Sequence, residues 1–323
     1  MPSALTNPMD ALRIANAIHA RQHPNARPPF EFSLVAVGGP RLVHCAGGLQ
    51  LPAGVLPDVP PDLVLIPGLE YQGEADCKNQ LDSLHAESEL LKQYAKAGVQ
   101  IGAHCSGTLL LAHTGLLDNK AATTSWWLVP TFIRLYPSVI LQTNAMVAED
   151  GQFITAGAVT ALFTLLLRII EQRAGPELAQ NTARFLLVDY TQQSQAAFIS
   201  KALMQRPRSA FGDRVDDYLQ RQISTDTAPI SVQALAAHAA VSQRTLLRRF
   251  RALYQQSPQA HLQDLRIERA KALLTATALD LSEILSQCGY ADLASFRKLF
   301  KRKTALTPSA YRAQFSTAAR PIR

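Results

Sequence analysis

Apolar residues near the end of the chain repeat with helical spacing in two copies that lie fifty positions apart. The repeated apolar positions are Leu235, Leu246 and Phe250 in the first copy and Leu285, Phe296 and Phe300 in the second. In each copy, a short helix with the i, i+3, i+4 pattern is followed by a break and a second helix. The pattern therefore predicts an all-α domain with two helix-turn-helix units in tandem.

Residues that start and stop helices fall where these two units need them. Ser242 is a favourable N-cap for a helix that ends near Tyr254, and Asp292 takes the same place in the second copy. Gly289 stands at the second break, where a left-handed turn costs glycine little. We expect one long helix over residues 258–276 to join the units.

The second helix of each unit has a polar and basic outer face. The outward positions are Gln243, Arg244, Thr245 and Arg248 in the first copy and Arg297, Lys298, Lys301 and Arg302 in the second. One helical hairpin with a basic face is as often structural as functional, but two in tandem favour DNA binding. Two such helices on one connecting helix would enter successive major grooves, about 34 Å apart.

Charge separates the tail from the rest of the chain. Residues 211–323 hold 17 Lys and Arg against 9 Asp and Glu, whereas residues 1–210 hold 15 against 16. The formal charge of +7 therefore belongs to the tail. Because a basic domain releases counterions from a polyanion, the distribution also favours nucleic acid as the partner.

Short β-branched runs alternate with helical segments in the front part of the chain. The predicted strands are residues 32–37, 63–66, 99–103, 146–148 and 153–155, and the predicted helices include residues 9–20, 80–97 and 107–114. This alternation predicts an α/β fold, a parallel-sheet sandwich that binds ligands at the carboxyl ends of its strands. The apolar run at residues 154–167 is interrupted by Gly157 and several Thr, so we interpret it as buried rather than membrane-spanning.

The chain is long enough for two domains. Its 323 residues are 47% hydrophobic, and polar stretches without apolar periodicity occur at residues 191–195 and 206–209. We predict an α/β domain over residues 1–188, a linker over 189–210, a DNA-binding domain over 211–316 and a tail over 317–323. The start of the chain lacks a secretory signal, so we expect a cytoplasmic protein without membrane contact.

One cysteine stands at a strand-to-helix turn. Cys105 lies within the run Ile-Gly-Ala-His-Cys-Ser-Gly-Thr-Leu-Leu at residues 101–110, where small residues flank it. Such an elbow raises a side chain above the sheet, near a helix N-terminus whose dipole favours a thiolate. Cys105 is therefore either a nucleophile or a small residue that lines a pocket.

The tail closely resembles the AraC family of bacterial transcription regulators over residues 211–315. The matching stretches are residues 242–250, 265–274, 288–290 and 296–312. The resemblance implies DNA contacts from Gln243, Arg244, Arg248, Leu293, Arg297 and Lys298, and we add the neighbouring Thr245 and Lys301. The family usually has Gly three residues before each Pro, where this chain has Gln255 and Ala305, so we expect both turns to be shaped differently.

Residues 7–188 are similar to the PfpI-like domain of the class I glutamine amidotransferase superfamily, in the form fused ahead of AraC domains. The resemblance rests on residues 62–68, 101–118, 122–126 and 155–161, and it implies a flavodoxin-like fold. Catalytic members pair the elbow Cys with a His, which in the fused regulators usually stands directly before the Trp of a Thr-Thr-x-Trp segment. Ser125 occupies that place here, and Ser cannot carry a proton near neutral pH. We therefore expect a degenerate elbow at Cys105 and no enzyme activity.

Domains of this kind also begin with an apolar strand before their first helix, whereas only eight residues precede it here. We expect either a sheet without that strand or a start further upstream.

The candidate ligand pocket surrounds the elbow. Its predicted lining is Gly68, Leu69, Glu70, Cys105, Ser106, Ser125, Trp126 and Trp127. Indole faces attract quaternary amines, but neighbouring Trp side chains cannot share one direction, so we expect at least one to pack in the core or an interface. The resemblance implies an amino-acid or amine effector, and an activator that acts as a homodimer with RNA polymerase.

These features predict a sequence-specific transcription regulator that binds double-stranded DNA. Two alternatives stay open: an enzyme that uses Cys105 for amide or aldehyde chemistry while tethered to DNA, and an architectural DNA-binding protein without a ligand. The other cysteines, Cys45, Cys77 and Cys288, have no metal-site spacing, and no nucleotide-binding glycine pattern occurs. We therefore predict neither a metal nor a cofactor.

Overall fold

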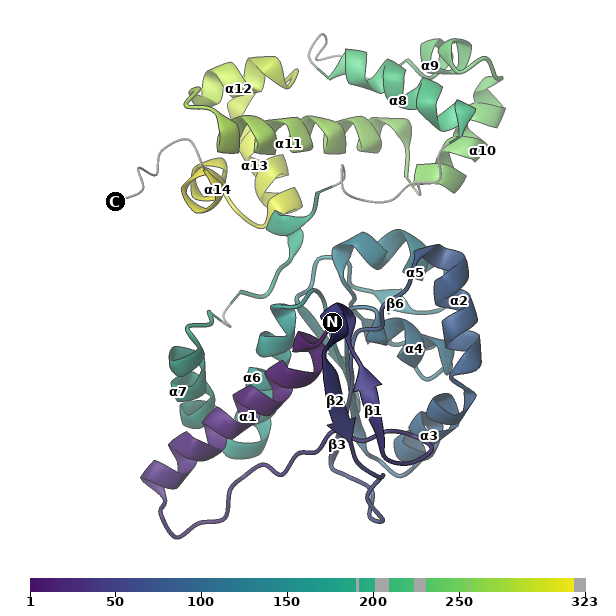
Figure 1. Ribbon diagram of the computed structural model, residues 1–323. Helices are drawn as coiled ribbons and strands as arrows, with labels where there is room; N and C mark the ends of the chain where they lie inside the picture. The colour runs from purple at the N-terminus through teal and green to yellow at the C-terminus, as the bar shows by residue number, and fades with distance from the viewer. Residues whose placement is uncertain (190–191, 201–208, 224–230, 255, 317–323) are drawn as a thin grey trace. The chain divides into compact units, whose positions relative to one another are not determined.

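The computed structural model describes all residues except 190–191, 201–208, 224–230, 255 and 317–323 (Figure 1). The chain divides into two compact units, Met1–Gln195 and Ala196–Arg323. The segment predicted as a linker, residues 189–210, is thus shared between the units, and the predicted tail lies outside the described residues.

A four-stranded sheet forms the middle of the first unit. Its strands, in spatial order, are β3 (Leu63–Ile66), β4 (Gln100–His104), β8 (Phe153–Ala156) and β7 (Val147–Asp150). The first three run parallel, and β7 runs antiparallel to β8. The expected α/β fold with a largely parallel sheet is confirmed.

Alternate residues of these strands face two helical layers. Ile66, Ile101 and Phe153 point to one core, where the sheet packs against four helices. Those helices are α2 (Gly73–Ser83), α3 (His85–Lys96), α4 (Gly107–His113) and α5 (Val129–Leu135). Ile154 and Ala156 point to the other face, which α6 (Ala161–Ala174) covers. Because both faces are buried, the strands are almost continuously apolar.

Two further helices complete the second layer. α1 (Ser3–Gln22) and α7 (Pro176–Leu186) pack with α6 around Leu12, Ile170 and Leu178, as Figure 1 shows. α1 extends the helix predicted over residues 9–20 at both ends.

Two predictions for the first unit are wrong in detail. Residues 32–37 form no strand, since Val35 makes only an isolated bridge to Gly54. The hairpin of β1 (Arg41–His44) and β2 (Gln50–Ala53) follows instead, and β5 (Ala121–Ala122) pairs with β6 (Ile140–Leu141) elsewhere. The helix predicted over residues 80–97 is divided into α2 and α3, because Leu84 leaves helical geometry at φ −88° and ψ 47°.

The second unit is helical. Its helices are α8 (Ala210–Gln222), α9 (Val232–His238), α10 (Gln243–Tyr254), α11 (Pro258–Ala276), α12 (Leu281–Gln287), α13 (Leu293–Thr304) and α14 (Pro308–Phe315). The two helix-turn-helix units are α9–α10 and α12–α13, and α11 joins them over the expected residues. The six apolar positions of the duplication are all buried, three in each of two cores.

The expected caps and breaks are present. The Ser242 hydroxyl accepts a hydrogen bond from the Thr245 backbone N–H at 3.3 Å, and the Asp292 carboxylate accepts one from the Ser295 N–H at 2.7 Å. Gly289 has a φ of 68°, the left-handed conformation that its position required. Within the described residues, every helix is too short or too polar to cross a bilayer.

The turn after α13 keeps a left-handed residue although no glycine is there. Ala305 has a φ of 62°, so its backbone takes the conformation that glycine favours, and the expected change of shape is not found at this turn. The corresponding Gln255 lies outside the described residues.

The Ala305 backbone predicts a stabilising substitution. Ala305→Gly should raise the free energy of unfolding by about 0.5–1 kcal/mol, because relief of left-handed strain exceeds the entropy that glycine loses. Ala313→Gly is the control: at an exposed interior position of α14 it should lower stability by about 1 kcal/mol. Urea unfolding measures both, and a loss of stability in Ala305→Gly would contradict the strain.

Candidate ligand site and nucleic-acid interface

The elbow at the end of β4 has the sharp geometry that its sequence predicts. Cys105 has a φ of 55°, a left-handed conformation that is strained for a residue with a Cβ. Its backbone N–H is held by the carbonyl oxygens of Ala156 and Gly157, both at 3.0 Å. The neighbouring strand β8 thus fixes the strained residue in place.

Small residues let the elbow approach the end of β3. A Cβ on Gly107 would lie 2.5 Å from the carbonyl oxygen of Pro67, so only glycine fits the start of α4. A Cβ on Gly68 would lie 3.5 Å from the Cys105 Cβ, and the Ser106 hydroxyl donates to the Leu69 carbonyl at 2.6 Å. The structure therefore brings together Gly68, Leu69, Cys105 and Ser106 from the predicted pocket.

None of the described side chains forms a hydrogen bond or ion pair with the Cys105 thiol. The adjacent His104 is 4% exposed, and burial lowers its pKa to about 4, so it stays neutral at physiological pH. His113 is turned to other partners: its ring nitrogens lie 3.3 Å from the Tyr136 hydroxyl and 3.6 Å from an Asp82 oxygen. The thiol thus has no evident base.

Tyr71 is a site residue that sequence reasoning missed. It is half-buried and, like Leu69 and Cys105, packs against the core between the sheet and helices α2 to α5. Burial raises its pKa, and the nearby Cys77 and Cys105 raise it further, so the phenol is neutral and cannot serve as a base. Its place in the loop after β3, at the carboxyl end of a parallel strand, is the signal that points to it.

Ser125 is closed off rather than open to a ligand. It is fully buried, and its hydroxyl has no hydrogen-bond partner within the described part of the chain. The preceding Thr124 donates its hydroxyl to the Cys105 carbonyl at 2.8 Å, which ties this loop to the elbow. Ser125 is therefore next to the site, and a ligand reaches it only if the loop opens.

The remaining predicted pocket residues lie further out. Glu70 is exposed, Trp126 is half-buried and Trp127 is 38% exposed. The two indole rings stand at 90° with centroids 5.4 Å apart. Neither Trp is buried in the core of the first unit, so of the two expected places, core or interface, the interface stays a prediction.

The first recognition helix, α10, presents a polar face to solvent. Gln243, Arg244 and Arg248 are exposed, and no carboxylate of the described residues lies within ion-pair distance of either arginine. Arg244 and Arg248 are one helical turn apart and therefore share a face. Thr245 is half-buried, and its hydroxyl contacts that of the capping Ser242 at 2.9 Å.

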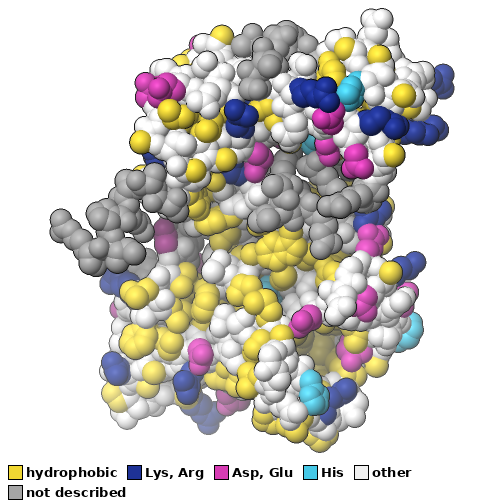
Figure 2. Space-filling view, turned by 45° about the horizontal axis from the view of Figure 1, so that its top comes forward, with side chains coloured by type: hydrophobic (Ala, Val, Ile, Leu, Met, Phe, Trp, Pro, Cys, Tyr) yellow, Lys and Arg dark blue, Asp and Glu magenta, His cyan; other side chains and the backbone are white. Residues whose placement is uncertain are grey.

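The second recognition helix, α13, is more basic. Arg297, Lys298, Lys301 and Arg302 are exposed, and among the described residues none of them is paired with an acid. Figure 2 shows Lys and Arg side chains on the surface of the second unit. Leu293 is half-buried and packs against the second core, so its first role is in packing rather than at the surface.

No three His, Cys, Asp or Glu side chains of the described residues gather in a way that holds a metal ion. What the first unit offers is a cysteine with a strained backbone, with small residues and Tyr71 near it. The second unit offers two basic helices.

Comparison with known proteins agrees with this division. Residues 22–172 match the DJ-1/PfpI family, and residues 235–314 match a helix-turn-helix domain. The chain is 23% identical over 307 residues to the HTH-type transcriptional regulator GbdR of Pseudomonas aeruginosa, which covers 94% of this chain and 79% of the relative. It is 27% identical over 314 residues to the regulator CdhR of the same organism, with 94% and 86% covered. It is 29% identical over 232 residues to the regulator GlxA of Rhizobium meliloti, with 70% and 69% covered.

The matched domains and the relatives that align with most of the chain lead to one assignment: this chain combines an N-terminal DJ-1/PfpI domain with a C-terminal helix-turn-helix domain, as in named HTH-type transcriptional regulators.

Proposed function

We propose that the chain regulates transcription by binding specific double-stranded DNA, with its α/β unit as a non-catalytic sensor of a small metabolite. The observation that carries this proposal is the pair of solvent-exposed, unpaired basic helices α10 and α13 on one connecting helix. The relatives described above are all named transcriptional regulators, which supports a regulator rather than an enzyme.

Capture of genomic DNA by the purified protein tests the function directly. We expect a few fragments with a common operator to be strongly enriched. Capture of all fragments with equal affinity would instead indicate an architectural DNA-binding protein, and no capture would contradict the proposal.

The two recognition helices have different chemistry. In α10, Gln243 and two arginines are suited to the edges of bases, since amide and guanidinium groups donate in pairs. In α13, the first exposed residue is Ala294, and the charges lie further along the helix. We infer that the first unit reads sequence and the second mainly holds phosphates.

This division predicts different effects of two exposed cations. Arg244→Ala should cost about 1–3 kcal/mol of binding and relax the preference at one base pair, whereas Lys301→Ala should weaken binding equally on all sequences. Titrations of the captured operator and of its single-base variants measure both. Equal, sequence-independent losses in the two variants would contradict base reading by Arg244.

The absence of a partner for the Cys105 thiol among the described residues supports a sensor rather than a catalyst.

A sensor must transmit its state, and residues 192–199, here called the strap, are suited to do so. In the first unit Gln195 is 2% exposed, and its side-chain N–H donates to the Thr124 carbonyl at 2.9 Å. Its amide also packs on Gly157, where a Cβ would lie only 2.8 Å from it. Thr124 and Gly157 are two of the residues that form hydrogen bonds with the Cys105 backbone, so Gln195 contacts two supports of the elbow.

The other half of the strap belongs to the DNA-binding unit. Ala197 is buried in the core of the second helix-turn-helix unit, and the short helix Ala196–Phe198 packs beside α13. Phe198 meets Phe315 edge to face at 5.3 Å, and the Lys271 ammonium donates to the Ile199 carbonyl. The two anchors, Gln195 and Ala197, are only two residues apart, so little chain lies between them to absorb a shift at the elbow.

The strap predicts that a change at Cys105 alters DNA binding only while the connection is short. Alkylation of Cys105 with iodoacetamide should shift operator affinity at least severalfold in the natural chain. It should leave affinity unchanged once Gly-Ser-Gly-Ser is inserted between Gln195 and Ala196. Cys105→Ala treated with the same reagent controls for the other thiols. The same shift with and without the insertion would contradict transmission through the strap.

We further propose an amine or amino-acid effector, and an activator that works as a homodimer with RNA polymerase, as the AraC-type resemblance implies. The support for an amine is the partly open Trp126–Trp127 pair, because ring faces attract quaternary ammonium groups.

Trp126 supplies the test of the effector class. Glycine betaine should raise the melting temperature of the natural chain, and Trp126→Ala should abolish that shift. Trp127→Ala is the matched control for loss of an indole at the perpendicular ring. An unchanged shift in Trp126→Ala would exclude this residue from the site.

A further inference from the structure

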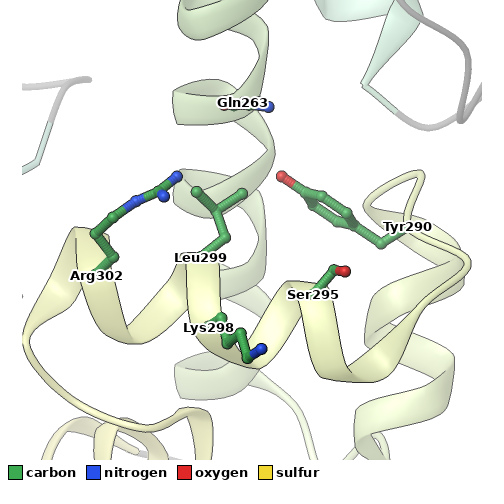
Figure 3. A pocket seen from close by; sticks show the side chains of 6 residues that line it. All are labelled: Gln263, Tyr290, Ser295, Lys298, Leu299 and Arg302. Carbon is green, nitrogen blue, oxygen red and sulfur yellow. The ribbon is translucent and has the colours of Figure 1, made fainter.

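A pocket of about 300 Å³ lies beside α13 in the second unit. Its lining comes from three elements: α11, the turn before α13, and α13 itself. The lining residues are Gln263, Tyr290, Ser295, Lys298, Leu299 and Arg302 (Figure 3). In Figure 3 the Arg302 guanidinium and the Tyr290 hydroxyl face each other across Leu299.

The Tyr290 hydroxyl is a donor without a partner. Its oxygen is buried and forms no hydrogen bond with any described residue. Burial raises the pKa of Tyr290 to about 12, so the group keeps its proton at physiological pH and can donate it. A buried hydroxyl without a partner is unfavourable, and a ligand with an acceptor oxygen would remove that cost.

The charge around the pocket is positive. Lys298 and Arg302 are exposed, and no described carboxylate lies within ion-pair distance of either, whereas the neighbouring Lys303 is bound to Asp264 at 2.8 Å. The pKa of Asp292, the acid that caps α13, is lowered by the Ser295 side chain, by the backbone N–H groups of Ser295 and Ala294, and by the nearby Lys298. Its charge is thus engaged in capping the helix.

The pocket therefore fits a ligand that carries negative charge and accepts hydrogen bonds. We propose that the pocket binds one phosphodiester group of the DNA backbone, with Arg302 as the cation and the Tyr290 hydroxyl as a hydrogen-bond donor. The proposal rests on the proposed DNA binding and adds the Tyr290 hydroxyl, which lies outside α13, to the exposed cations of that helix. DNA is the favoured source of the phosphate, because Ser295 and Lys298 belong to the helix that would enter the groove.

Tyr290→Phe separates this role from a structural one. The substitution removes only an unpaired buried hydroxyl, so stability in urea should stay the same or rise. The dissociation constant for the captured operator should nevertheless rise about tenfold, since a hydrogen bond to a charged group is lost. Unchanged operator affinity in a folded Tyr290→Phe variant would overturn the proposal.

Arg302→Ala tests the cation. It should weaken binding about tenfold and reduce the slope of log affinity against log salt by about 0.9, the value for one phosphate contact. Arg269→Ala removes the same charge from an exposed position of α11 outside the pocket and should have a clearly smaller effect. Equal losses of affinity in the two variants would show that Arg302 acts only through general electrostatic attraction, and would overturn the proposal.

Neutral methylphosphonate groups placed one at a time along the operator identify the contact. At one position the loss caused by the neutral group and the loss caused by Arg302→Ala should overlap rather than add. Additive losses at every position would overturn the proposal. Inorganic phosphate tests whether the pocket binds a free anion instead of DNA. The proposal would also be overturned if phosphate raised the melting temperature while both pocket variants kept the operator affinity of the natural chain. If the natural chain binds no operator at all, the proposed function fails, and the pocket is not the cause.

Discussion

Helix α11 belongs to both hydrophobic cores of the DNA-binding unit, and the placement of the two recognition helices depends on this sharing. Leu265 packs with the core of the first helix-turn-helix unit, while Ile267 and Leu274 are buried in the core of the second. Nineteen residues of helix span about 28 Å, close to the distance between successive major grooves on one face of DNA. Asp264, which is 5% exposed, also ties α11 to α13 through Lys303. A single rigid helix thus sets the spacing between two surfaces that must act on one duplex.

The α/β unit keeps the architecture of a nucleophile site, while no described side chain forms a hydrogen bond or ion pair with its thiol. The left-handed Cys105, the glycine at the start of α4 and the hydrogen bonds from β8 all preserve the elbow. Proton transfer needs a base within reach, and the two nearby histidines are either buried and neutral or engaged elsewhere. Strain that would serve catalysis in an enzyme can serve detection in a sensor, because a strained loop has little to stabilise it against a second arrangement.

The proposed transmission depends on the chain being short where it leaves the first unit. A long flexible linker averages out small displacements, whereas anchors only two residues apart leave little chain in which to absorb them. Gln195 is fixed by the loops that support the elbow, and Ala197 is fixed in the core of the second unit. In the proposed mechanism, these two anchors connect the elbow to the unit that holds α13, whatever the orientation of the two units.

Local features of the fold could be read from the sequence because their causes are local. The duplicated apolar spacing, the caps at Ser242 and Asp292 and the left-handed Gly289 involve neighbours within one or two helical turns. The strands of the parallel sheet were predictable for a similar reason, since burial on both faces leaves a continuous apolar run. Errors arose where propensity competed with packing: residues 32–37 have the composition of a strand but pair at a single bridge, and a helical pattern continues through the break at Leu84.

The sequence by itself determined that there are two domains, which of them binds DNA, and where the strained cysteine lies. Only the tertiary structure decided what surrounds that cysteine and what lies beside the second recognition helix. Tyr71, Thr124 and Gln195 come from three separate segments, and no spacing along the chain indicates that they converge. Tyr290, in the turn before α13, and Arg302, near the end of that helix, likewise line one pocket only because the turn folds back beside α13 and Gln263 of α11. Periodicity reports which face of an element is buried, whereas the partners across a core are chosen by packing between elements.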